Sequence, residues 1–246
     1  MRYEIYLLVG IVSVMGALAT TEAGAIDGPP GQVFAHWSFD EKDQDGDIIR
    51  DLGPHGFHGT IKSQNDTSLE PVEGVRGQAL RFPDNHQSWI ELTEGFQLEP
   101  PFTITAWVKI VSRRSTMEIL GQKAHSWDEG MRFVFSLRRM FFEYSDGDED
   151  IQVRNDVHQT SGDQWAFVAV VHDGQDVALY VDAEQIQKER AAPAVPTSRR
   201  ALIGNYVVQK ETYGFVGTMD ELIIMDEALS SEQLVELGLW VLADGS

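Results

Sequence analysis

Apolar and polar side chains alternate with a period of two along most of the chain. The clearest runs are residues 102–110, 131–137 and 177–181, in each of which every second position is apolar. Because successive side chains of a β-strand point to opposite faces, this pattern predicts strands with one face in a core. Residues 165–171 are apolar at every position, which predicts a central strand covered on both faces. Further short strands, separated by turn residues, are expected at residues 33–39, 59–62, 78–82, 88–92, 117–122, 140–144, 184–188, 200–204 and 214–225.

Only one segment has helical spacing. Ser230 begins a capping sequence, Leu234, Val235 and Leu237 follow at helical intervals, and Gly238 ends the predicted helix. About a dozen short strands followed by one late helix predict an all-β fold. In this fold, a two-sheet antiparallel β-sandwich carries one short C-terminal helix.

The first 25 residues have the features of a signal peptide. Arg2 provides a short positive start, Ile5–Leu18 is an apolar run, and small residues precede a cleavage site at Ala25. We therefore expect residues 26–246 to form one domain that is secreted, periplasmic or held at the cell surface. The apolar run is too short for a membrane span, and no later segment is apolar enough to insert into a bilayer.

Charge and cysteine content narrow the classes of partner. The 246 residues include 39 acidic and 19 basic side chains, which gives a net charge of −20. Such a chain repels phosphate backbones and anionic membranes, so nucleic acid is not expected as a partner. The charge suits divalent cations and neutral ligands, and it also keeps an exported protein soluble. The absence of cysteine excludes a disulfide scaffold, a cysteine metal site and a thiol nucleophile.

Several segments resemble, in order, the laminin-G-like domains among the concanavalin A-like lectin/glucanase jelly rolls. The resemblance rests on residues 36–40 (HWSFD), 51–59 (DLGPHGFHG), 74–82 (GVRGQALRF), 102–109 (FTITAWVK), 165–174, 179–182, 203–204, 217–222 (GTMDEL) and 228–230. It extends between residues 33 and 237. Ala183 departs from the family, in which glycine is usual, and residues 239–246 run past the family's end.

The resemblance implies two antiparallel sheets, one of them concave, with the first strand beside the last. It implies carbohydrate or protein binding in many members, often with calcium. Catalysis does not follow from it, because the same fold carries lectins, adhesion modules, glucanases and lyases.

Three aspartates are candidate ligands of a structural calcium ion (Ca²⁺). Asp220 lies in a segment that is apolar on both faces, and a buried carboxylate needs a hydrogen bond, an opposite charge or a metal. If the first and last strands pair, Asp40 and Asp51 come near Asp220, and calcium prefers such oxygen ligands. The alternative is that these aspartates accept hydrogen bonds from backbone amides in turns.

Aromatic side chains near loops are candidates for a ligand platform, because sugars place their C–H faces on such rings. Trp127 lies in a polar loop, and Tyr206 and Tyr213 flank loops. The sequence therefore predicts a platform that combines Trp127 with Tyr206 or Tyr213. The alternative is that these rings fold over the edge of the sandwich. The other strand tryptophans, Trp37, Trp107 and Trp165, are expected in the core.

No catalytic motif supports an enzyme, although the question stays open. In the family that this chain resembles, glucanases carry a Glu-x-Asp-x-Glu signature on a strand. This chain lacks that signature. The favoured function is a secreted, non-catalytic module that binds carbohydrate and carries a structural calcium ion. Two alternatives remain: an adhesion or structural module that binds an extracellular protein, and a polysaccharide-cleaving enzyme.

Overall fold

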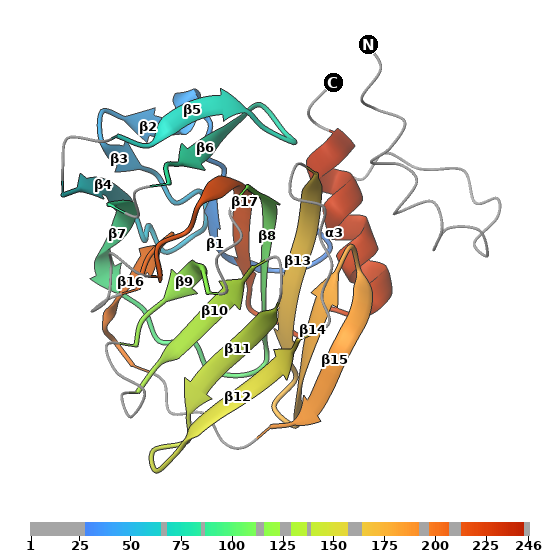
Figure 1. Ribbon diagram of the computed structural model, residues 1–246. Coiled ribbons are helices and arrows are strands. Elements are labelled where there is room, and N and C mark those ends of the chain that lie inside the picture. Colours follow the sequence, from blue (N-terminus) through green and yellow to red (C-terminus); the bar gives the residue numbers. More distant parts are fainter. Residues whose placement is uncertain are drawn as a thin grey trace, which may run out of the picture.

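Two antiparallel β-sheets form a sandwich, and one helix lies on the outer face of one sheet (Figure 1). This computed structural model confirms the all-β fold that the alternating pattern predicts. The predicted signal peptide and Trp127 lie outside the described residues. The structure describes residues 28–64, 68–84, 87–111, 116–123, 129–136, 139–156, 164–191, 197–206 and 213–243.

The eight-stranded sheet contains both the first and the last strand of the chain. Trp37 of the first strand lies opposite Leu222 of the last, and the two strands run antiparallel. The predicted pairing of the first and last strands is therefore confirmed. The order of the sheet is β15 (Glu184–Arg190), β14 (Asp176–Val181), β13 (Trp165–His172), β8 (Phe102–Ile110), β17 (Gly217–Met225), β6 (Gln78–Phe82) and β5 (Glu70–Glu73), with β1 (Val33–Trp37) also paired to β17.

The nine-stranded sheet includes three consecutive strands joined as hairpins, β10 to β12. Its order is β12 (Asp150–Asn155), β11 (Met140–Ser145), β10 (Met131–Phe135), β9 (Glu118–Gly121), β16 (Arg200–Ile203), β7 (Ser88–Gly95), β4 (Gly59–Ser63), β3 (Ile48–Ile49) and β2 (Gln44–Asp45). The pattern did not predict β2, β3, β5 or β12. The first two have two residues each, and β5 and β12 are rich in polar side chains, so none shows a clear apolar alternation.

A large apolar core fills the space between the sheets, and a second, smaller one lies under the helix α3 (Ser231–Ala243). Strand β13 contributes to both cores, with Val168 and Val170 in the first and Phe167 and Ala169 in the second. The prediction of a central strand covered on both faces is confirmed. Figure 1 shows α3 running alongside β13, β14 and β15.

The helix continues beyond the residue at which the sequence predicted its end. Gly238 does not terminate α3, which extends to Ala243. Leu237 and Val241 are both fully buried against the sheet, so the apolar stripe extends past the glycine. This burial outweighs the low helix propensity of one glycine. No helix within the described residues is long and apolar enough to cross a membrane.

Candidate ligand-binding face

A line of side chains crosses the outer face of the nine-stranded sheet. Arg132 of β10 lies opposite Glu143 of β11. Phe133 and Phe142, which adjoin them, belong to the core between the sheets, so Arg132 and Glu143 point outward. Residues paired across neighbouring strands share a face, and the register extends the line in both directions. We call this line the transverse row, and its members are Gln152, Glu143, Arg132, Gly121, Leu202 and Glu91.

Arg132 lies at the centre of the row and is held by acidic side chains on both sides. Its Nε donates to Glu118 Oε1 at 2.9 Å, and its Nη2 donates to Glu118 Oε2 at 3.0 Å. Its Nη1 lies 3.5 Å from Glu143 Oε1. The Glu118 side chain is 0% exposed and the Arg132 side chain 11% exposed. This fork-shaped ion pair is therefore largely shielded from water, which strengthens it and fixes its geometry.

Glycine at position 121 makes room for this ion pair. A Cβ atom at Gly121 would lie only 2.5 Å from Glu118 Oε1. Any side chain there would displace the Glu118 carboxylate from Arg132. The absence of a side chain at Gly121 thus leaves room for the ion pair between Glu118 and Arg132.

Arg132 also stacks on one of the tyrosines that the sequence predicted as a ligand platform. Its Cζ lies 4.2 Å from the ring centroid of Tyr206 and 5.8 Å from that of Tyr213. The two tyrosine rings meet edge to face, with centroids 5.6 Å apart and planes inclined at 80°. The structure therefore brings Tyr206 and Tyr213 together, while Trp127 lies outside the described residues.

The two tyrosines differ in their access to solvent. Tyr206 is 6% exposed, whereas Tyr213 is half-buried. Tyr213 is thus the ring of this pair that presents more surface to solvent. Tyr206 contacts both Tyr213 and Arg132 and is the more buried of the two rings.

A second buried cation lies beside the row. The Lys123 side chain, just after β9, is 0% exposed and forms an ion pair with Asp150. Its Nζ is also 3.8 Å from Glu143 Oε1. Gln152 Nε2 donates to Glu143 Oε2 at 3.0 Å. Glu143 therefore lies among two cations and an amide.

Burial perturbs the charges of the central pair. Removal from water raises the pKa of Glu118 to about 7, although Arg132 partly opposes the shift. Burial disfavours the charge of Arg132, but attraction to Glu118 outweighs burial and raises the pKa of Arg132 above its ordinary value. Arg132 therefore stays charged, and Glu118 ionises less readily than a carboxyl group in water.

Sequence reasoning missed Glu118, Arg132 and Glu143 as members of a site. The available signal was a charged residue inside an apolar strand pattern, as with Arg132 in residues 131–137 and Glu143 in residues 140–144. Their convergence depends on β9, β10 and β11 being neighbours, in that order. The alternating pattern gives the faces of each strand but not this order.

The aspartates predicted to bind calcium accept backbone hydrogen bonds. Asp220 Oδ2 accepts from the amides of Val75 and Arg76 at 2.8 and 3.2 Å, and Oδ1 accepts from the amide of Glu221 at 2.9 Å. Burial, together with the charge of Glu221, raises the pKa of Asp220 to about 8 against these three amides. Asp40 accepts from the amide of Gln78 at 2.7 Å.

Asp51 accepts its hydrogen bonds from other parts of the chain. Its Oδ1 accepts from the amides of His36 and Gly53, and its Oδ2 from the amide of Phe57. Within the described residues, no three histidine, aspartate or glutamate side chains are grouped to hold a metal ion. Asp40, Asp51 and Asp220 therefore do not fit as ligands of one shared ion, and calcium binding stays a prediction.

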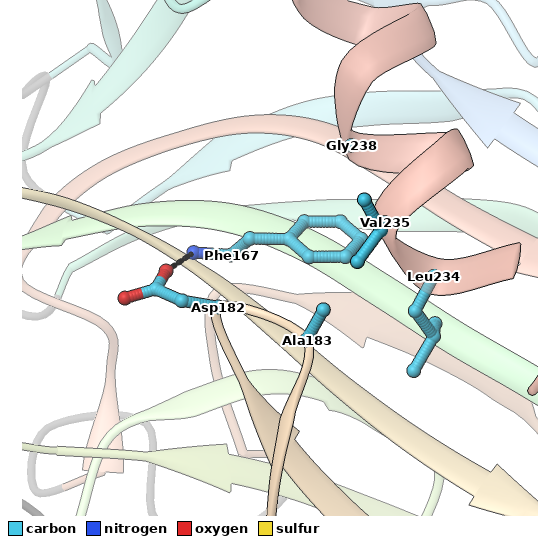
Figure 2. A pocket seen from close by; sticks show the side chains of 6 residues that line it. All are labelled: Phe167, Asp182, Ala183, Leu234, Val235 and Gly238. Carbon is cyan, nitrogen blue, oxygen red and sulfur yellow. Dashed lines mark hydrogen bonds between the residues drawn. The ribbon is translucent and has the colours of Figure 1, made fainter. Parts of the chain in front are cut away.

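A small hollow lies between α3 and the turn that joins β14 to β15 (Figure 2). It encloses about 10 Å³. Phe167, whose amide donates to Asp182 Oδ1 at 2.9 Å, faces Val235 and Gly238 of the helix across it. Space of this size holds about one water molecule, so the hollow is a packing gap rather than a ligand site.

The chain is similar to known proteins in sequence and in fold. Residues 83–235 match the family described as the concanavalin A-like lectin/glucanases superfamily. Among solved structures, domain 4 of AbnA, an extracellular GH43 arabinanase from Geobacillus stearothermophilus in complex with arabinotriose, is 22% identical with a TM-score of 0.66. The match covers 84% of this chain and 98% of that domain. No curated protein matches the sequence.

Two toxin domains are also similar in fold. The botulinum neurotoxin serotype D ligand-binding domain, in complex with N-acetylneuraminic acid, is 11% identical with a TM-score of 0.60, and the match covers 88% of this chain and 52% of that one. The binding domain of Paraclostridial Mosquitocidal Protein 1 is 14% identical with a TM-score of 0.62, and the match covers 85% and 52%. The chain therefore spans about half the length of these toxin domains.

Proposed function

Because the chain belongs to the concanavalin A-like lectin/glucanases superfamily, we propose that it is an exported, non-catalytic module that binds carbohydrate. The binding surface is the outer face of the nine-stranded sheet around Tyr213 and the transverse row. The observation that carries this proposal is the half-buried ring of Tyr213, which stands edge to face on Tyr206.

An aromatic ring of this kind suits a sugar. The apolar C–H face of a pyranose or furanose packs on an aromatic face, while its hydroxyl groups need donors and acceptors around the ring. Arg132 stacks on Tyr206, and the exposed Gln152 side chain supplies amide donor and acceptor atoms farther along the row. A rigid ring with nearby polar atoms reduces the entropy lost on binding.

The charged groups of the row favour binding over hydrolysis. Glycoside hydrolysis needs two carboxyl groups on either side of the scissile bond, with room for the sugar between them. Here Arg132 occupies the space between Glu118 and Glu143 and contacts both. Glu118 is also fully buried. These two carboxyl groups are therefore not free to flank a substrate.

The similar structures add support for carbohydrate as the ligand class. The arabinanase domain holds arabinotriose, and this chain covers almost all of that domain. The neurotoxin domain holds N-acetylneuraminic acid. Export is supported by the predicted signal peptide and by the extracellular origin of the arabinanase.

A glycan array with the protein lacking residues 1–25 tests the proposal. We expect concentration-dependent binding to a subset of oligosaccharides, and no release of reducing ends from the corresponding polysaccharides. Absence of binding to all glycans, together with binding to an extracellular protein, would favour the adhesion alternative. Release of reducing ends would instead show an enzyme.

A further inference from the structure

The charges around the transverse row carry an inference about the class of ligand. We infer that this face binds uncharged glycans and discriminates against acidic ones, such as uronates, sialic acids and sulfated sugars. The inference rests on the proposed function and deepens it.

The two buried cations of the face are already neutralised. Arg132 binds Glu118 through two hydrogen bonds and also lies beside Glu143. Lys123 forms an ion pair with Asp150 and is near Glu143 as well. Three carboxylates therefore surround two cations. An acidic sugar would find no cation without a counter-charge at the centre of the row.

The basic side chains of β12 and β16 on this face are paired in the same way, whereas Lys62 of β4, beyond the end of the row at Glu91, is exposed. Arg154 of β12 donates to Asp156 at 2.7 Å, and Arg200 of β16 lies 3.6 Å from Glu91. Each basic side chain that the described part of β9 to β12 and β16 places on this face thus contacts a carboxylate. The chain as a whole carries a net charge of −20, so the long-range field also repels anions.

Taking a cation away from its partner would be costly. If the carboxylate of a ligand displaced Glu118 from Arg132, Glu118 would remain buried without a counter-charge. The groups left for a ligand are acceptors and an amide. Gln152 is exposed and carries an amide oxygen that can accept a hydrogen bond, whereas Glu143 Oε1 is buried and out of a ligand's reach. Sugar hydroxyl groups donate to such acceptors, whereas carboxylates and sulfates do not.

The test is an array of neutral oligosaccharides, each paired with a carboxylated or sulfated form of the same backbone. We expect the neutral form of each bound pair to bind at least tenfold more tightly than its acidic form at 50 mM salt. We also expect the affinity for the neutral form to change less than twofold between 50 and 500 mM salt, since no ion pair forms on binding.

Two variants with the same change of charge provide the control. Gln152→Arg adds one positive charge to the face beside Glu143, and we expect it to reduce the preference for neutral sugars at least threefold. Gln185→Arg adds the same charge to exposed strand β15 of the other sheet and should leave the preference unchanged. Acidic forms that bind as well as or better than neutral ones would overturn the inference while leaving carbohydrate binding intact. Absence of binding to both forms would overturn the inference together with the proposed function.

Discussion

Asp40 and Asp220, from opposite ends of the chain, accept hydrogen bonds from the same turn between β5 and β6. Asp40 accepts from the amide of Gln78, and Asp220 accepts from the amides of Val75 and Arg76. The turn therefore fastens the segment that follows the first strand to the last strand. This contact adds to the direct pairing of β1 with β17.

Two glycines allow both aspartates to approach the turn. A Cβ atom at Gly74 would collide with Asp220 Oδ2, and one at Gly77 would collide with Asp40 Oδ1. Gly77 also has a φ of 55°, which lies in the left-handed region that favours glycine. The GVRG sequence is thus explained by two carboxylates that the sequence alone does not place beside it.

Removal of the Asp220 carboxylate should destabilise the protein strongly. Asp220→Ala leaves three backbone amides without acceptors, one of them buried and two partly buried, at a cost of about 3 kcal/mol in the free energy of unfolding. Chemical denaturation measures this change. Asp47→Ala, at an exposed position, is the control and should change stability by less than about 0.5 kcal/mol. Equal stability of the two variants would contradict the role given to Asp220.

The stability of the protein should decrease as the pH rises from 5 to 8. Burial raises the pKa of Glu118 from 4.5 to about 7 and that of Asp220 from 3.8 to about 8. At these two carboxyl groups the native state therefore holds more protons than the unfolded state, and their contribution to the free energy of unfolding falls with pH. Buried His172, whose pKa is lowered, acts in the opposite direction through a smaller shift. The part due to Glu118 is present below pH 4.5 and lost by pH 7, and it amounts to about 3 kcal/mol.

Urea denaturation at pH 5, 6, 7 and 8 measures this dependence. Glu118→Gln removes one of the two titrating groups and should flatten the curve between pH 5 and 7. The decrease due to Asp220 should persist in this variant. A stability that rises with pH in the unmodified protein would contradict the assignment of raised pKa values to both groups.

Alanine at position 238 should stabilise the protein by about 1 kcal/mol. Gly238 lies inside α3, where alanine is the better helix former, and it borders the small hollow in Figure 2. A Cβ atom there would contact Phe167 and Trp107 at 3.8 Å, an ordinary packing distance. The melting temperature reports the gain. Gly95→Ala, whose Cβ would collide with the Ser198 carbonyl oxygen, is the opposite control and should lower the melting temperature.

Calcium should leave the melting temperature unchanged if the three aspartates act only through backbone amides. Asp51 and Asp220 each accept three such hydrogen bonds, and Asp40 accepts one and lies 3.3 Å from Lys42 Nζ. Thermal melting with 5 mM calcium and with a chelator makes the comparison. A rise with calcium that Asp40→Asn or Asp51→Asn abolishes would support the predicted metal site instead.

Strands could be predicted from the sequence where apolar and polar side chains alternate within the strand itself. Residues 102–110 and 131–137 alternate clearly, and both are strands in the structure, the second ending at Phe135. Strand β12 was not predicted because its outward side chains are polar and only Val153 is fully buried. The predicted end of α3 at Gly238 was wrong, because the burial of Val241 depends on the sheet beneath the helix.

The candidate face was only partly predictable. The sequence places Tyr206 and Tyr213 next to loops, which predicts them as candidates for a ligand platform, and the structure brings them together. The alternating pattern of residues 131–137 marks Arg132 only as a polar position of a half-buried strand. Its ion pair with Glu118 depends on the neighbouring strand and on the missing side chain of Gly121, and both are tertiary features.

Isothermal titration with the glycan that binds best on the array tests the central claim most directly. Tyr213→Ala should weaken binding at least tenfold, because it removes the ring that the sugar contacts, and its circular dichroism spectrum should be unchanged. Trp165→Ala removes a half-buried ring from the outer face of the other sheet and should leave affinity unchanged. Full affinity in the folded Tyr213→Ala variant, or loss of binding only in Trp165→Ala, would contradict the assignment of the ligand to this face.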